Sequence, residues 1–346
     1  MFVMTASVMG ARASNTARRA GTVLVTLLGL LALTFIIGRV MPLDPVLAVV
    51  GPDADSSTYD QVYRSMGLDK PIWTQFGLYL NDLLHGDFGN ALLTGHPVLD
   101  DILRVFPATI ELATLAILFG VLIGLPLGVC AASNQGRLGD HVARVITLFG
   151  YSTPIFWLGM MGLLVFYAWL GWAGGAGRID LAYDGMVPEV TGLLLIDSTL
   201  ARDWDAFASA LRHIVLPALI LGLNSVAYIS RMTRSFMLEQ LSQEYIITAR
   251  VKGLSRRQVV WGHAFRNILV QLLTVVALAY GSLLEGAVLI ETVFAWPGFG
   301  QYLTSSLMLG DMNAVMGCVL VVGMIFVVLN LLSDLLYQVF DPRTKV

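Results

Sequence analysis

Long apolar stretches alternate with shorter polar segments along the whole chain. A helix needs about 20 apolar residues to cross a bilayer, and six stretches are of that order of length. The pattern predicts an all-α membrane protein with six transmembrane helices. The predicted spans are Ala20–Val40, Thr109–Ala131, Val142–Leu170, Ile214–Ser230, Ile268–Ile290 and Ala314–Leu336.

Prolines fall inside two of these spans. Pro126 lies in the second and predicts a kink there, because proline removes a helical hydrogen bond. The third span, Val142–Leu170, is long enough either to tilt in the bilayer or to bend at Pro154.

Composition supports a bilayer protein. Hydrophobic residues make up 56% of the chain and charged residues 13%, against about 25% charged residues in soluble domains. The mean hydropathy is +0.74. A net charge of only -3 gives no reason to expect a nucleic-acid partner. Cys130 and Cys318 lie in apolar stretches, where they are interpreted as small hydrophobic residues rather than as a disulfide.

The distribution of lysine and arginine predicts the orientation of the spans. With the N-terminus in the cytoplasm, 14 of the 21 lysines and arginines fall on the inner side. Arg18 and Arg19 precede an apolar run that is too long for a signal peptide, which predicts an uncleaved first span. The predicted inner segments are then 1–19, 231–267 and 337–346, and the predicted outer segments are 41–107, 171–213 and 291–313.

The first outer segment predicts two short helices. One covers Ser57–Met66, and the other begins at Pro71, since proline suits the first turn of a helix, and ends near Leu84. Two acidic residues lie inside spans: Asp334 at the inner end of the last, and Glu285 toward the outer side of the fifth. We interpret Asp334 as interfacial, whereas Glu285 either faces a water-filled vestibule or contacts cargo.

The sequence lacks the usual patterns of catalysis. It contains no phosphate-binding loop of the Gly-x-x-x-x-Gly-Lys-Ser/Thr type, no His-Glu-x-x-His, no Cys-x-x-Cys and no recognisable catalytic triad. Its five histidines are scattered, so no metal site is expected from this chain alone. We therefore expect no catalytic residue here, and if ATP drives the protein, another chain must bind it.

The inner segment between the fourth and fifth spans has a helical start at Glu244, a break at Gly253 and a second helical stretch from Ser255. This pattern predicts a compact knob of two short helices around a glycine. By its charge alone the segment would be an ordinary basic connector.

This segment resembles the ATPase-coupling loop of ABC-importer permeases, in their dipeptide/oligopeptide branch. Gln271 stands where the branch usually has a proline. Further similarity is spread over nearly the whole chain, including Gly86–Gly89, Pro107–Leu112, Pro154–Gly159 and Glu291–Gly300. The coupling residues that match are Glu244, Tyr245, Ala249, Arg250, Lys252, Gly253, Leu254, Ser255, His263, Arg266 and Asn267.

The resemblance implies a type I ABC-importer permease in the bacterial inner membrane. Its implied partners are a second, homologous permease, two cytoplasmic ATPases that hold ATP and Mg, and an external substrate-binding protein. It also implies peptide cargo, although members of the branch carry nickel, glutathione, or sugar-like and opine-like compounds. The implied translocation path or outer gate comprises Glu285, Glu291, Phe294, Trp296 and Pro297.

Three alternatives remain open, one to the gating role and two to import. The turn from Trp296 to Gly300 has the amphipathic character of an interfacial anchor, which competes with a gating role. A secondary carrier or channel working alone competes with the importer, but the scarcity of charged residues in mid-membrane argues against it. A membrane-embedded enzyme is a third hypothesis, and it lacks any recognisable catalytic set.

Overall fold

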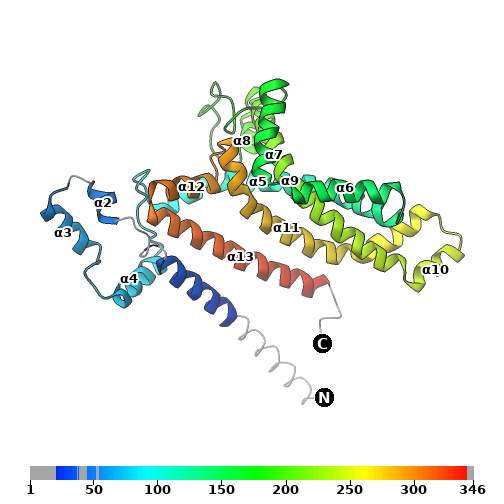
Figure 1. Cartoon of the computed structure of the whole chain (residues 1–346), viewed down its shortest axis with the longest axis horizontal. Helices are drawn as coiled ribbons and strands as arrows, with labels where there is room; N and C mark the ends of the chain where they lie inside the picture. The colour runs from blue at the N-terminus through cyan, green and yellow to red at the C-terminus, as the bar shows by residue number, and fades with distance from the viewer. Residues whose placement is uncertain (1–20, 37, 39–44, 52–53, 341–346) are drawn as a thin grey trace, which may run out of the picture. The chain divides into compact units, whose positions relative to one another are not determined.

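The computed structural model describes residues 21–36, 38, 45–51 and 54–340, and among them the chain is helical, with no strand (Figure 1). The expected N-terminal tail 1–19 and residues 341–346 lie outside the described part. A first helix covers Gly21–Ile36. The others are α2 (Pro45–Val50), α3 (Ser56–Ser65), α4 (Ile72–Leu84), α5 (Val98–Ser133), α6 (Leu138–Ser152), α7 (Ile155–Gly162), the π-helical η1 (Leu163–Trp169), α8 (Leu194–Ala201), α9 (Trp204–Leu241), α10 (Glu244–Val251), the π-helical η2 (Gln258–Ala264), α11 (Phe265–Phe294), α12 (Phe299–Leu309) and α13 (Met312–Phe340).

Four helices are long and apolar enough to cross a membrane by themselves. They are Val98–Ser133, Trp204–Leu241, Gln258–Phe294 and Met312–Leu331. Each contains all or most of one predicted span, and three of them run well beyond it. The helix Gly21–Ile36 is the described part of the first predicted span. The number of six spans and their sidedness stay predictions.

The third predicted span is two helices rather than one tilted helix. α6 and the α7–η1 helix meet at an angle of 97°. Thr153, before the proline, has an extended backbone (φ -89°, ψ 129°), as is usual for a residue that precedes proline. Pro154 also lacks the N–H that would continue the helix. The bend expected at Pro154 is therefore present, and the alternative of a straight, tilted span is wrong.

The two helices expected before α5 are both present. α3 covers the expected Ser57–Met66 to within one residue at each end, and Asp55 caps it by accepting a hydrogen bond from the Thr58 N–H. Pro71 lies immediately before α4 rather than inside its first turn. Gly86 follows the end of α4 with a positive φ of 79°, which explains why the helix stops there.

The described chain divides into two compact units. The first joins the residues up to Ile102 to Ser305–Val328. Its buried Asp311 accepts hydrogen bonds from the backbone N–H groups of Leu92 (2.6 Å) and Leu93 (3.3 Å), which ties the start of α13 to the loop before α5.

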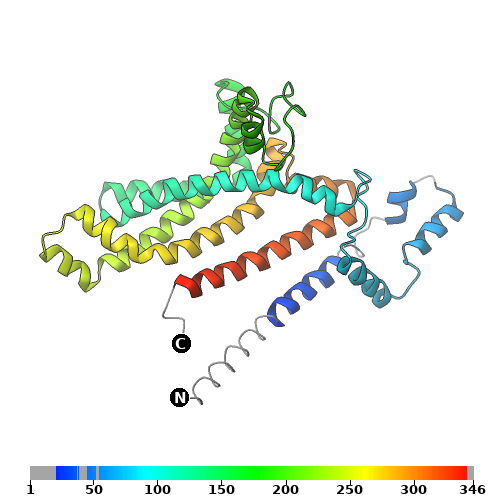
Figure 2. The ribbon, with the colours of Figure 1, turned by 180° about the vertical axis from the view of Figure 1, so that it is seen from behind.

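The second unit contains Leu103–Thr304, and its core is formed by α5, α9 and α11. These helices lie side by side in both ribbon views (Figures 1 and 2). Three glycines spaced four residues apart, Gly120, Gly124 and Gly128, face α9 from α5. Such a stripe of small residues lets two helix backbones approach closely.

We predict that Gly128→Ala destabilises this pair of helices. The added Cβ would lie 2.6 Å from both the Ser230 carbonyl oxygen and the Thr233 Cβ, and forced overpacking costs about 1–3 kcal/mol. The control is Gly139→Ala, whose added Cβ would lie 3.7 Å from the Cys130 Sγ. Thermal unfolding of the detergent-solubilised complex should show a lower Tm for Gly128→Ala alone. Equal Tm values for both variants would contradict the close approach of α5 and α9.

Candidate functional site

The segment that follows α9 packs against the end of α9, η2 and the start of α11. α10 buries Ile246 (0% exposed) and Ala249 (6%). These two residues join one apolar cluster with Met237 of α9 and with Val259 and Val260 of η2. The segment is therefore held rigidly against α9 and α11, which is the property that a force-transmitting element needs.

The break between α10 and the next helix is built by two local devices. Gly253 has φ +81°, which other residues adopt with strain, and its N–H donates to the Arg250 carbonyl (3.0 Å). Ser255 and Gln258 then form a reciprocal cap. The Ser255 N–H donates to Gln258 Oε1 (3.0 Å), and the Gln258 N–H donates to Ser255 Oγ (3.4 Å).

The first of the two predicted short helices is present as α10. The prediction that the second helix is short is wrong. From Arg256 onward the chain is helical without interruption through η2 and α11 to Phe294. Gln271, at the position usually held by proline, keeps its backbone N–H within this helix. The knob is thus one short helix plus the first turns of a very long one.

The predicted coupling residues lie in two parts of the segment, and one of them is buried. Glu244, Tyr245, Arg250, Lys252, Gly253 and Ser255 are exposed around α10 and the turn after it, Leu254 is half-buried, and Ala249 is buried. His263, Arg266 and Asn267 are exposed on η2 and the start of α11, separate from α10 in the chain.

Two apolar side chains of α10 are exposed. Ile247 is 58% exposed and Val251 is 83% exposed, and Arg250 lies on the same short helix. If this segment lies outside the membrane, as the sequence predicts, these exposed apolar side chains are candidates for contact with another protein. Sequence reasoning had not singled out Ile247 and Val251, because apolar residues are unremarkable in a membrane protein.

At the opposite end of α11 lies a buried carboxylate. Glu291 is 0% exposed. Thr109 of α5 donates its hydroxyl to Glu291 Oε1 (2.6 Å), and the backbone N–H groups of Gly300 (2.6 Å) and Gln301 (3.0 Å) in α12 donate to Oε2. A Cβ on Gly298 would lie 2.6 Å from this carboxyl group, so glycine is required there. We call this arrangement, Glu291 with Thr109, Gly300 and Gln301, the Glu291 latch.

The two aromatic residues beside the Glu291 latch are buried too. Phe294 and Trp296 are each 1% exposed. The indole N–H of Trp296 donates to the Ala108 carbonyl (3.0 Å), and the Arg178 guanidinium lies 5.6 Å from the centre of the Trp296 ring. The interpretation of Trp296 as an interfacial anchor is therefore wrong, because its ring packs inside the protein.

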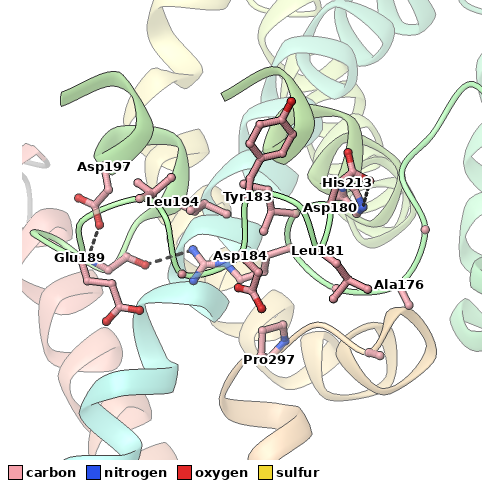
Figure 3. Close-up of a pocket in the computed structure, with 18 of the residues that line it drawn as sticks. Ala176, Asp180, Leu181, Tyr183, Asp184, Glu189, Leu194, Asp197, His213 and Pro297 are labelled. Carbon is pink, nitrogen blue, oxygen red and sulfur yellow. Dashed lines mark hydrogen bonds and ion pairs between the residues drawn. The ribbon is translucent and has the colours of Figure 1, made fainter. Parts of the chain in front are cut away.

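The remaining predicted path residues, Glu285 and Pro297, are at the surface. Glu285 is exposed on α11, and no described residue forms an ion pair with it. Pro297 lines a cavity of about 760 Å³ that is walled mainly by the segment between η1 and α8 (Figure 3). The structure thus divides the predicted path residues into three that hold the fold and two that could meet solvent or cargo.

Polar groups line this cavity (Figure 3). Arg178 donates to Glu111 Oε2 (2.6 Å) and to the Gly192 carbonyl (3.1 Å), which fixes the loop to α5. His213 is buried, with Nε2 3.7 Å from Asp180 Oδ1. These contacts were not predicted, because they join loop residues to helices by side chains that no sequence motif marks.

Asp197 organises the other wall of the cavity. Its carboxylate accepts hydrogen bonds from the N–H groups of Thr191 (2.9 Å) and Gly192 (3.0 Å). Burial raises the pKa of the Asp197 carboxyl, but hydrogen bonds from Thr191, Gly192 and Val190 outweigh burial and hold that pKa below its ordinary value. The group is therefore a structural anion at neutral pH.

A smaller cavity of about 180 Å³ lies among α6, α7, α9 and α11. Tyr151, Asn224 and Tyr228 contribute polar groups to it, and Asn224 is exposed although it lies within a predicted span. Arg231 lies over the rings of both tyrosines, at 5.4 and 5.9 Å from their centres. Tyr151, Asn224 and Tyr228 are polar residues inside apolar stretches, and this is the signal by which the sequence could have revealed them.

Comparison with known proteins agrees with this architecture. Residues 124–346 match the family described as binding-protein-dependent transport system inner membrane component, and residues 15–113 match its N-terminal family. The chain is 44% identical over 325 residues to the probable D,D-dipeptide transport system permease protein DdpB of Escherichia coli, covering 93% of this chain and 94% of that protein. It is 42% identical over 330 residues to the di/tripeptide transport system permease protein DppB of Pseudomonas aeruginosa, covering 95% and 98%.

A solved structure shares the fold. The MetNI methionine ABC transporter, in an inward-facing conformation, matches with a TM-score of 0.53 and 18% identity, over 70% of this chain and 97% of the matched chain. The fold is that of a type I ABC-importer permease. The chain belongs to the family of binding-protein-dependent transport system inner membrane components.

Proposed function

We propose that this chain is the transmembrane permease subunit of an ATP-driven importer that passes di- or oligopeptides into the cytoplasm. The observation that carries the proposal is similarity to dipeptide permeases over more than nine-tenths of the chain. An external binding protein delivers the peptide, and a second, homologous permease completes the passage. Both chain ends lie in the cytoplasm, as the distribution of lysine and arginine indicates.

The coupling step is assigned to the knob. The exposed side chains of Ile247 and Val251 enter a groove on a partner ATPase, which holds ATP and Mg. The buried side chains of Ile246 and Ala249 fasten α10 to the ends of α9 and α11. Because both attachments are made by one helix of eight residues, movement of the ATPase surface displaces the membrane helices directly.

The gate is assigned to the outer end of α11. Glu291, Phe294 and Trp296 fix the turn that leads into α12, while Pro297 faces the outer cavity and Glu285 faces outward from α11. Further along the path, Asn224 and Tyr228 offer hydrogen-bonding groups to a peptide backbone. In this proposal, the buried contacts of Glu291 and Trp296 hold the turn in place, and the polar groups that line cavities contact the passing peptide.

The test of the proposal is uptake of a radiolabelled dipeptide by proteoliposomes that contain the complete complex. Uptake should require external binding protein and internal ATP, and complexes that lack this chain should show none. Unlabelled dipeptide should compete, whereas Ni²⁺ and glutathione should not. Uptake without ATPase would contradict the importer, and competition by Ni²⁺ or glutathione alone would contradict the peptide cargo.

We predict that Val251→Glu detaches the ATPase. Val251 is 83% exposed, so the change leaves the fold intact, but it places a charge in a contact that has to be desolvated. The matched control is Gln243→Glu, which adds the same charge at the N-cap of α10, where a negative charge is tolerated. Co-purification from membranes with equal amounts of permease should show at least a tenfold loss of ATPase for Val251→Glu alone. Full recovery of ATPase with Val251→Glu would exclude α10 as the docking surface.

A further inference from the structure

A second large cavity, distinct from the outer one, lies where three long helices end or begin. Its volume is about 720 Å³. The turn after α5 forms one wall, and the last turn of α9 forms another. The third wall comes from α10 and the residues that follow it through η2, which we call the coupling segment. By the predicted orientation, this cavity opens at the cytoplasmic surface of the membrane.

The charged residues that line this cavity are all basic. Arg137, Arg250 and Arg256 line it, and no aspartate or glutamate does so among the residues that the structure describes. Arg256 donates only to neutral acceptors, the Ser133 carbonyl and Asn134 Oδ1. Within the described chain, neither Arg137 nor Arg250 forms an ion pair. Three guanidinium groups around a concave, partly apolar surface focus a positive potential that favours an anion.

The arginine side chains suit a phosphate group. Arg137 and Arg250 line the cavity and are exposed, so their guanidinium groups are accessible to a ligand. The oxygen atoms of a phosphate group could accept charge-assisted hydrogen bonds from these planar guanidinium groups.

Apolar side chains also line this cavity. Leu238, Leu241 and Leu254 are half-buried, so part of each side chain is free to contact a ligand. A free phosphate ion gains nothing from these side chains. The glycerol and the first methylene groups of a phospholipid would cover them, and basic pockets between membrane helices on the cytoplasmic side suit anionic headgroups.

We propose that this cavity binds a phosphate-bearing anion, supplied by the headgroup of an anionic phospholipid. Arg137 and Arg250 contact the phosphate, and the half-buried leucine side chains contact the start of the acyl chains. The bound headgroup then joins the end of α5 to the coupling segment. The proposal is independent of which cargo the importer carries.

The test uses the complete permease–ATPase complex in nanodiscs. The Tm is measured in phosphatidylcholine, in phosphatidylcholine with increasing phosphatidylglycerol, and in phosphatidylcholine with inorganic phosphate. Phosphatidylglycerol should raise the Tm with saturation, and millimolar inorganic phosphate should not. The variant Arg137→Gln should weaken the apparent affinity for phosphatidylglycerol about tenfold, as expected for one charge-assisted hydrogen bond.

The matched control is Arg257→Gln, which removes the same charge from an exposed position next to Arg256 that does not line the cavity. The side chain of Arg137 makes no capping hydrogen bond to α6, so its replacement should leave the fold intact. Equal effects of both variants would overturn the proposal. Stabilisation by inorganic phosphate alone would assign the site to a free anion and overturn the lipid. Loss of ATPase from Arg137→Gln in phosphatidylcholine would assign the cavity to the ATPase instead.

Discussion

The carboxyl group of Glu291, which is buried and forms no ion pair with any described residue, fixes the C-terminal end of α11. Glu291 is fully buried, and a hydroxyl group from α5 and two backbone N–H groups from α12 satisfy its oxygen atoms. Removing the carboxylate would leave the buried donors of Thr109 and Gly300 unpaired, at about 1–3 kcal/mol each. The turn that carries Trp296 and Pro297, and through it the edge of the outer cavity, depends on this latch.

The same helix that ends at the Glu291 latch begins in the coupling segment. From Arg256 to Phe294 the chain is helical without a break, and the apolar cluster around Ile246 fastens α10 to its first turns. A helix packed on one side against α9 and α5 moves as a stiff rod rather than by local bending. The two ends therefore belong to one mechanical element, with the proposed docking surface at one end and the proposed gate at the other.

Sequence reasoning recovered what periodicity and turn chemistry determine locally. The helices from Ser57 and from Pro71, the bend at Pro154 and the break at Gly253 each follow from residues within one or two turns. Four of the apolar stretches lie inside helices long enough to span a membrane. The burial of Glu291 and Trp296 could not be read from the chain, because it arises from contacts with Thr109 and Ala108, more than 180 positions away. The exposure of Ile247 and Val251 was hidden for a similar reason: only the packing of Ile246 and Ala249 decides which face of α10 is free.

The most direct test of this account measures ATP hydrolysis and dipeptide uptake together, in proteoliposomes that contain either the natural complex or Glu291→Ala. If the Glu291 latch holds the gate end of α11, the variant complex should keep its ATPase and continue to hydrolyse ATP. Its uptake per ATP hydrolysed should fall at least tenfold, because movement of the coupling segment no longer reaches the outer turn. An unchanged ratio of uptake to hydrolysis would show that the outer end of α11 is not the gate, and would contradict the account.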